Sequence, residues 1–188
     1  MTPRYMYHGT DTIINTVNLD KSRLRTDFGK GFYLSSKLGV ARDWAVDKSG
    51  ALKTPTVMRL TMDIEKLNAS DLVVLRFDQP NVEWLNFIRD NRQINAIAPF
   101  FEEPRHNYDI VSGPIANDKV AQVVVDYIDG LISADEAIRK TKALPSVFQI
   151  SLHTQKALIS IVHSEYQQRL SNGKWSEWIK VETSAEKQ

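Results

Sequence analysis

A histidine followed directly by glycine is the first pair of residues in this chain whose types could do chemistry. His8 and Gly9 come at the end of a predicted short strand that begins at Arg4. An imidazole can donate or accept a hydrogen bond, and a glycine leaves its backbone amide and carbonyl accessible. A planar carboxamide needs one donor and one acceptor close together. A lone histidine is also commonly structural, so the pair by itself leaves both interpretations open.

Two aromatic residues further along the chain could stack on a flat ring. Tyr33 lies in the stretch DFGKGFYLS, where Gly29 and Gly31 lead into a strand predicted over residues 30–35. Trp44 lies on a helix predicted over residues 37–49, whose apolar residues recur at helical spacing. Aromatic residues so placed can sandwich a ligand, or they can belong to the core. The two glycines match neither the GxxxxGK of a phosphate loop nor the GxGxxG of a dinucleotide fold.

The rest of the chain predicts a single domain of mixed α and β structure. We expect strands over residues 56–62, 71–77, 108–112 and 147–153, and helices after Pro80, from about 118 to 130, from 133 to about 142 and over 154–168. Ser133 and Glu136 have the spacing of a capping box. A length of 188 residues suits one domain, which we place at 1–183 with a frayed tail at 184–188.

The composition excludes several classes of site. There is no cysteine, which rules out thiolate zinc sites, iron–sulfur clusters and a cysteine nucleophile. The histidines show no paired ligand spacing, so we expect no metal site; they are His8, His106, His153 and His163. A net charge of +1 gives no overall attraction to nucleic acid or to anionic membranes. No apolar run approaches the roughly 20 residues of a membrane span, and no signal peptide is evident, so we expect a cytoplasmic protein.

Four motifs, taken in order, resemble the ADP-ribosyltransferase superfamily. YHGT, FGKGFYLS and the ARDW that follows are similar to the first two signature regions of the branch that contains diphtheria toxin and the poly(ADP-ribose) polymerases, which carries a His-Tyr-Glu triad. DIVSGPIAND and QISLHT extend the resemblance to a bacterial family of that superfamily, over roughly residues 5–160. The resemblance implies an α+β fold, with a split β-sheet core and surrounding helices.

The same resemblance implies that the protein is an enzyme that uses NAD as its substrate. His8 would bond the hydroxyl of the adenosine-side ribose or orient NAD, Gly9 would grip the nicotinamide carboxamide, and Tyr33 and Trp44 would stack on the nicotinamide ring. Basic residues before the second motif could contact the pyrophosphate, because guanidinium binds phosphate oxygens in a bidentate manner. The full set implied in NAD binding is His8, Gly9, Thr10, Arg23, Arg25, Gly31, Tyr33 and Trp44.

The third member of the triad departs from the pattern. Gln149 stands where the family has glutamate; an amide can bond a ribose hydroxyl, but it carries no charge and cannot act as a base. Asp109 or Asp118 could supply the missing carboxylate, although Asp118 also suits a helix cap, and Glu165 in HSEY is a further candidate. The predicted catalytic set is His8, Tyr33, Gln149, Asp118 and Asp109.

Two functions therefore remain open. The first is mono-ADP-ribosyl transfer, a glycosyltransferase reaction, onto a macromolecular acceptor that is a protein or a nucleic acid. The superfamily that the chain resembles suggests a bacterial toxin or defence effector, with an antitoxin as a possible partner and no membrane involvement. The second is a transferase-fold module that binds NAD or a related nucleotide and has weak activity or none.

Overall fold

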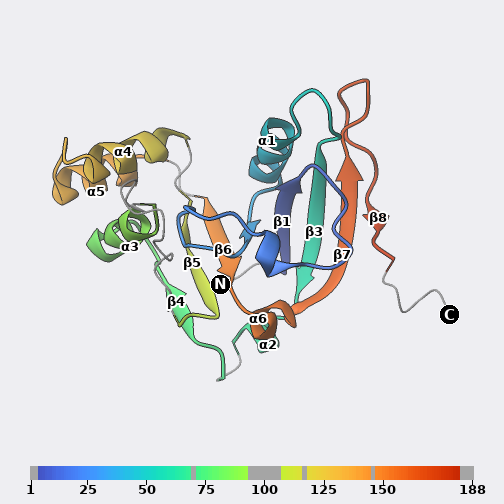
Figure 1. Cartoon of the computed structure of the whole chain (residues 1–188), viewed down its shortest axis with the longest axis horizontal. Coiled ribbons are helices and arrows are strands. Elements are labelled where there is room, and N and C mark those ends of the chain that lie inside the picture. The colour runs from blue at the N-terminus through green and yellow to red at the C-terminus, as the bar shows by residue number, and fades with distance from the viewer. Residues whose placement is uncertain (1–3, 69–70, 93–106, 116–117, 145–146, 183–188) are drawn as a thin grey trace. The chain divides into compact units, whose positions relative to one another are not determined.

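The computed structural model describes residues 4–68, 71–92, 107–115, 118–144 and 147–182, without the side chains of residues 118 and 119. These residues form eight strands, six α-helices and one 3₁₀ helix, which confirms the α+β class (Figure 1). They gather into two compact units. Unit 1 comprises residues 1–18, 33–71 and 155–188, and unit 2 comprises residues 19–32 and 72–154.

Unit 1 is built on an antiparallel sheet. The strand order is β2 (Phe32–Ser35), β1 (Tyr5–Thr10), β3 (Thr56–Met62), β7 (Ile161–Gln168) and β8 (Ile179–Lys180), with Phe32 itself assigned to unit 2. β1 pairs with β3 along its whole length, and β3 pairs with β7 in the same way. Figure 1 shows β1, β3 and β7 side by side, with the helix α1 (Leu38–Ser49) beside them.

The sequence explains why these elements form. β3 reads TVMRLTM, a β-branched and apolar segment of the kind that fits a pleated, half-buried surface. α1 buries Ala41 and Ala45 against Val57 of β3 and ends at Gly50, whose φ of 54° lies in the left-handed region. Two short helices, α2 (Ile64–Leu67) and α6 (Gln155–Leu158), complete this unit.

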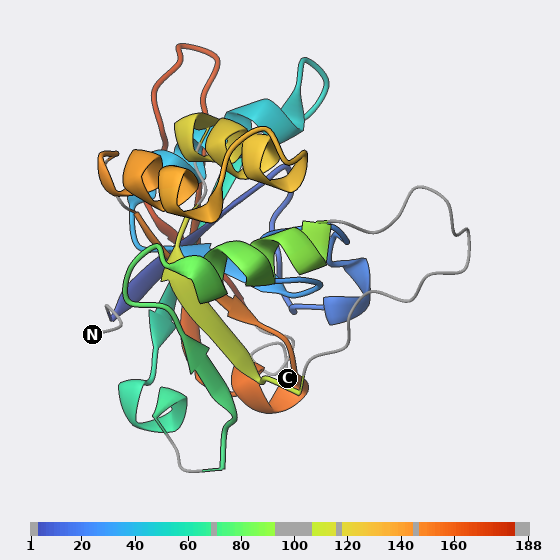
Figure 2. The same cartoon turned by 90° about the vertical axis from the view of Figure 1, so that its left-hand side faces the viewer.

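Unit 2 combines a small mixed sheet with a layer of helices. β4 (Val74–Arg76) runs parallel to β5 (Ile110–Pro114), which pairs antiparallel with β6 (Phe148–Leu152). The helices α3 (Val82–Arg92), α4 (Asp118–Ile128) and α5 (Ala134–Lys142) lie together, as Figure 2 shows. Trp84 and Val124 are fully buried.

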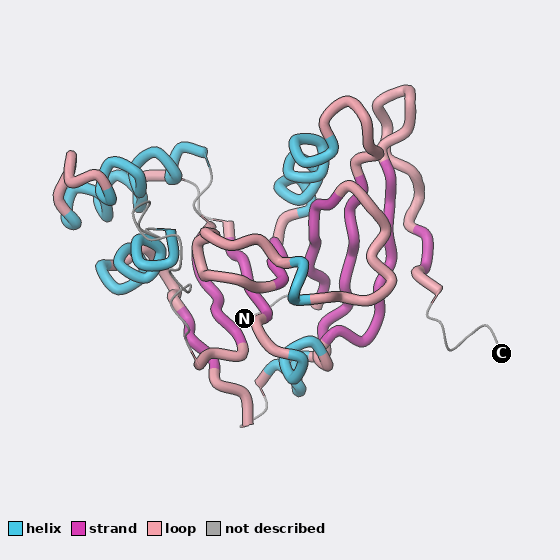
Figure 3. The backbone as a smooth tube through the Cα atoms, in the orientation of Figure 1, coloured by secondary structure: helices cyan, strands magenta, loops and turns pink. Residues whose placement is uncertain are grey.

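Side chains cap two helices of unit 2. Asn81 Oδ1 accepts the Trp84 amide at 2.8 Å at the start of α3, and Ser133 Oγ accepts the Glu136 amide at 3.3 Å at the start of α5. The Ser133 contact confirms the predicted cap. The connection from β1 to β2 is drawn in Figure 3 as a long loop with one short helix, the 3₁₀ turn Leu19–Lys21, and its residues 19–31 belong to unit 2.

The helix expected over residues 154–168 is wrong. The chain makes only the short α6 there and then enters β7, an eight-residue strand paired with β3 from Met62 to Thr56. The apolar residues at 157, 158, 161 and 162 fit helical spacing, but pairing to a long neighbouring strand overrides that local pattern. The short elements α2 and β8 were not expected. Gly9 and Gly113 lie inside strands β1 and β5, where the sequence suggested strand ends.

That residues 1–183 form one domain stays a prediction, as does a cytoplasmic location. His106 and the tail at 184–188 lie outside the described residues. Within the described part of the chain, no helix is both long enough and apolar enough to cross a membrane.

Candidate functional site

His8 and Tyr33 are joined directly in unit 1. His8 Nδ1 lies 2.8 Å from the backbone carbonyl oxygen of Tyr33. A carbonyl can only accept, so Nδ1 carries the proton and Nε2 keeps the lone pair. Burial lowers the pKa of His8, the hydrogen bond to Tyr33 raises it and the charge of Lys48 lowers it, and together they bring the pKa from 6.5 to about 4. At neutral pH the ring is therefore an uncharged imidazole whose Nε2 is an acceptor for a hydroxyl group.

Gly9 lies against α1, close to Trp44. A Cβ built on Gly9 would lie 2.2 Å from the carbonyl oxygen of Ala41 and 2.9 Å from Trp44 Cβ. Only glycine lets the helix approach the strand this closely. The Trp44 side chain is 55% exposed, so its ring is available to a ligand. The packing gives Gly9 a structural reason that the sequence did not indicate, and its predicted bond to the carboxamide stays a prediction.

Unit 1 thus holds four of the predicted residues near one another: His8, Gly9, Tyr33 and Trp44. They come from β1, β2 and α1, and the two contacts just described link them in pairs. Thr10 differs, because its side chain is 1% exposed at the end of β1, opposite Thr56. Burial of that kind favours a structural role for the Thr10 side chain.

Gln149 is buried on β6 in unit 2 and contacts an acid that the sequence analysis did not consider. Its Nε2 donates to Asp27 Oδ2 at 3.2 Å. Arg92, at the end of α3, donates to Asp27 Oδ1 through Nε at 2.9 Å and also through Nη2. Asp27 is the first residue of DFGKGFYLS, but nothing local in the sequence marks its pairing with residues so far along the chain.

The loop that carries Asp27 continues along the same strand. A Cβ built on Gly31 would lie 2.3 Å from Ser151 Oγ and 3.0 Å from the ring of His153. The Lys30 carbonyl lies 2.9 Å from His153 Nδ1, which donates to it. Side chains two apart in a strand share a face. One side of β6 and of the residue that follows it therefore carries a row of three side chains, Gln149, Ser151 and His153. Gly31 is therefore explained by close packing of the loop on this row.

The other predicted acids do not face Gln149 by any described contact. Asp109 is 9% exposed, and both of its carboxylate oxygens are used: Oδ2 accepts the Val73 amide at 2.8 Å, and Oδ1 accepts the Thr154 hydroxyl at 2.6 Å. That arrangement joins three segments of chain. Asp118 is the first residue of α4, and its side chain lies outside the described residues.

The remaining candidates are charged residues at the surface or between strands. Arg23 and Arg25 are exposed in the loop of unit 2, and Arg25 has a φ of 58°, which is uncommon for a residue other than glycine. Glu165 lies on β7 and forms an ion pair with Arg59 of β3, whose Nε donates to it at 2.7 Å. The ion pair with Arg59 therefore gives Glu165 a structural role on the surface of the sheet.

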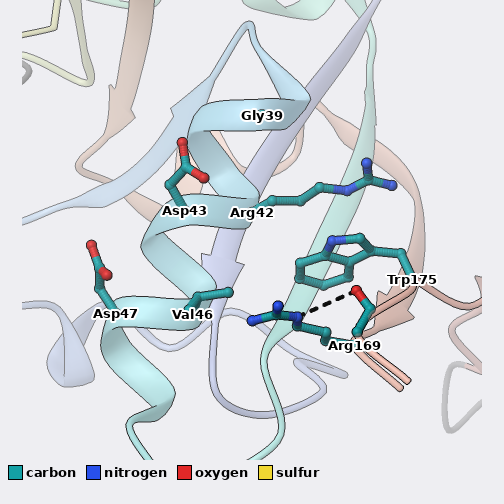
Figure 4. A pocket seen from close by; sticks show the side chains of 8 residues that line it. Gly39, Arg42, Asp43, Val46, Asp47, Arg169 and Trp175 are labelled. Atoms are coloured by element: carbon teal, nitrogen blue, oxygen red, sulfur yellow. Dashed lines mark hydrogen bonds between the residues drawn. The ribbon is translucent and has the colours of Figure 1, made fainter. Parts of the chain in front are cut away.

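A pocket of about 480 Å³ lies elsewhere on unit 1 (Figure 4). It is formed by α1 and the hairpin that follows β7, and none of the predicted site residues lines it. Arg42 already covers the Trp175 ring, with Cζ 5.1 Å from the ring centroid. In Figure 4 the side chains of Asp43 and Asp47 point away from that ring. The residues that line the pocket are Gly39, Arg42, Asp43, Val46, Asp47, Arg169, Gly173 and Trp175.

Comparison with known proteins places the chain in one family. A family model described as "Protein of unknown function (DUF3990)" matches residues 5–163, and the chain belongs to this family. Searches of curated proteins and of solved structures gave no match. Among the described residues, no group of three or more histidines or acids could hold a metal ion.

Proposed function

We propose that this protein is an NAD-dependent mono-ADP-ribosyltransferase that modifies a macromolecule. The observation that carries the proposal is the grouping in unit 1 of the His8–Tyr33 hydrogen bond and the Gly9–Trp44 contact. The resemblance assigns all four residues to NAD binding, Gly9, Tyr33 and Trp44 to the nicotinamide and His8 to the adenosine-side ribose or to orienting NAD. A toxin or defence role, with an antitoxin partner, rests on the resemblance alone.

The charge state of His8 supports this chemistry. In the transfer, the bond between the nicotinamide nitrogen and ribose C1′ breaks, and its electron pair stays on the nitrogen to give neutral nicotinamide. C1′ gains oxocarbenium character until an acceptor nucleophile bonds to it and releases a proton. A cationic imidazole in the NAD site would oppose the developing positive charge. A pKa of about 4 keeps His8 neutral, so Nε2 can accept a ribose hydroxyl at no such cost.

Trp44 supports the binding of a flat ring. Its side chain is 55% exposed although its Cβ lies against Gly9, so the ring extends from a fixed base into solvent. Stacking on such a ring is a common way to hold an aromatic ligand. The backbone of Tyr33 is fixed by the His8 bond, which defines where the Tyr33 side chain begins.

A second candidate function is an NAD-binding module without transferase activity. The observation in its favour is Gln149, an amide at the position of the catalytic glutamate. Isothermal titration calorimetry with NAD, combined with an assay for nicotinamide release, separates the two functions. Binding without release or labelling supports the module, and an absence of binding overturns both.

The test of transfer is incubation of the purified protein with labelled NAD and cell lysate. We expect labelled acceptors with the wild-type protein and a loss of about tenfold or more with His8→Ala, because one hydrogen bond that orients NAD is removed. His163→Ala is the matched control, since His163 is an exposed histidine of β7. Equal labelling by wild type and His8→Ala would refute the role of His8.

A further inference from the structure

We propose that Asp27 is a positioning residue for Gln149: its carboxylate fixes the amide so that Oε1 is presented as the acceptor for a ribose hydroxyl of NAD. The inference rests on the proposed function, and it adds a residue that the resemblance does not assign. It also answers how an uncharged amide could serve at the position of a glutamate.

The contact between Asp27 and Gln149 defines the orientation of the amide. Oδ2 of an ionised carboxylate can only accept, so the amide atom 3.2 Å from it is the NH₂ group. The other amide atom is then the carbonyl oxygen, which is the group able to receive a ribose hydroxyl. Without Asp27, rotation of the amide by a half turn would present a donor in that place.

Arg92 holds the Asp27 carboxylate in one position. Its Nε and Nη2 both donate to Oδ1, which leaves Oδ2 for Gln149. The side chains of Arg92 and Asp27 are 22% and 12% exposed, so the pair is largely shielded from water. Two donors from one guanidinium to the same oxygen restrain the position of Oδ1 more than a single hydrogen bond would.

The backbone of the loop is fixed as well. The Thr26 hydroxyl donates to the Gly29 carbonyl at 2.6 Å, and the Gly29 amide donates back to the Thr26 carbonyl at 3.2 Å. Two residues later, Gly31 packs on Ser151 and His153 of the same row as Gln149. The backbone around Asp27 is therefore held by the bonds between Thr26 and Gly29 and by the packing of Gly31.

The chain of bonds also strengthens Oε1 as an acceptor. A group that donates to a charged acceptor is polarised, and the polarisation raises electron density on the far side of the amide. Asp27, which is held by Arg92, exerts this effect on Gln149, a residue whose side chain has no charge of its own. The amide thereby approaches one property of the glutamate, a good hydrogen-bond acceptor, without the ability to act as a base.

The test uses the full chain and measures kcat and KM for nicotinamide release. We expect Asp27→Asn to lower kcat about 10- to 100-fold with a much smaller change in KM, because a misplaced catalytic group loses about this much rate. In a Gln149→Ala background, the same Asp27→Asn change should have little further effect, since Asp27 acts through Gln149. An unchanged kcat in Asp27→Asn, or an equal loss in both backgrounds, would overturn the inference.

The exchange variant Asp27→Asn/Gln149→Glu covers the case in which Asp27→Asn alone fails to fold. It keeps one acid and one amide in contact and places the acceptor oxygen at position 149. We expect it to exceed Gln149→Ala in kcat at least tenfold; activity equal to that of Gln149→Ala contradicts the inference. The melting temperatures of all variants separate a change in kcat from loss of folded protein.

An NMR measurement tests the contact without any activity. The side-chain NH₂ signals of Gln149 in the wild-type protein should be shifted by the carboxylate, and this shift should be lost in Asp27→Asn. Unshifted signals would refute the contact itself. A wild-type protein with shifted signals but no nicotinamide release refutes the proposed function, and the catalytic part of the inference with it. Turnover that is insensitive to Asp27→Asn refutes the inference alone.

Discussion

The close packing of α1 on β1 requires a residue without a side chain at position 9. Adding a single methyl group there tests this requirement. A Cβ at this position would lie 2.2 Å from Ala41 O, a backbone atom that cannot move without moving α1. We expect Gly9→Ala to lower the free energy of unfolding by roughly 2–3 kcal/mol, as overpacking does elsewhere. Urea denaturation followed by circular dichroism measures this.

Gly39 provides the matched control for that experiment. It lies on α1, and a Cβ built there meets nothing within 4 Å. We expect Gly39→Ala to stabilise the protein by up to about 1 kcal/mol, because alanine is the better helix former. Similar effects at Gly9 and Gly39 would contradict the close approach of α1 to β1.

The neutral state of His8 makes stability depend on pH. Burial lowers its pKa from 6.5 in the unfolded chain to about 4, so between these values the unfolded state binds more protons. The contribution to stability is fully present above 6.5 and is lost as the pH falls toward 4. It amounts to roughly 3 kcal/mol, taken from the size of the shift in pKa.

The variant His8→Asn checks this dependence, because an asparagine can still donate to Tyr33 O but does not titrate. We expect the difference in unfolding free energy between wild type and variant to change by roughly that 3 kcal/mol between pH 7 and pH 4. A difference that stays constant with pH, measured by urea titration, would mean that His8 is not held neutral by the fold.

Residue identity could be predicted further than residue partnership. His8, Tyr33, Trp44 and Gln149 stand out because their types and motifs suggest chemistry. The pairing of Asp27 with Arg92 and with Gln149 spans 65 and 122 positions of sequence, and no local pattern encodes such a contact. The sequence accordingly pointed to Asp109 and Asp118, the acids nearest the later motifs, rather than to Asp27.

At the scale of elements, most helices and strands follow from periodicity and capping. α1, α3, α5 and β3 appear close to their expected bounds, because each carries a clear apolar pattern, a capping residue or a β-branched run. The prediction for the residues of β7 fails for a physical reason. Their apolar positions fit both a helix and a strand, and only the pairing with β3 decides between them. That pairing is non-local, so a local reading cannot include it.

The tryptophans of unit 1 should separate ligand binding from stability. Trp44 is 55% exposed on α1, whereas Trp178 packs near the core, 6.2 Å from the Tyr7 ring and 4.4 Å from the Arg59 guanidinium. We expect Trp44→Ala to weaken NAD binding at least tenfold, the loss of one stacking contact, while changing unfolding free energy by less than about 1 kcal/mol.

Trp178→Ala should show the opposite pattern. Removing this ring takes one packed neighbour from Arg59 and from Tyr7, so we expect a loss of roughly 2–3 kcal/mol in stability and little change in NAD affinity. Calorimetry and urea denaturation on both variants give the comparison. Equal effects on NAD affinity would refute the stacking role of Trp44.

At the scale of the molecule, unit 1 is assembled from three separate segments of chain. β3 pairs with β7 in a register that joins Thr56 to Gln168, so this sheet needs residues from both ends of the sequence. Non-local pairings of this kind are made late in folding, after the cost of closing a long loop. The sheet of unit 1 therefore depends on the C-terminal strands.

Truncation tests that dependence. We expect a chain ending at Thr154 to lose hydrogen-exchange protection in β1 and β3, because β3 then lacks its β7 partner and Arg59 lacks Glu165. A chain ending at Glu182 keeps β7 and β8 and should retain this protection. Protected β3 amides in the shorter chain, measured by mass spectrometry, would contradict the prediction.

One short edge strand in each unit has a consequence for how the protein behaves at high concentration. β8 is two residues long and includes Lys180, and β4 is three residues long and ends in Arg76. Short edges that carry a positive charge are poor templates for a strand of another molecule. The longer strand β3 is paired on both sides, with β1 and with β7, and is kept away from these outer positions, which limits the growth of intermolecular sheets and favours colloidal stability.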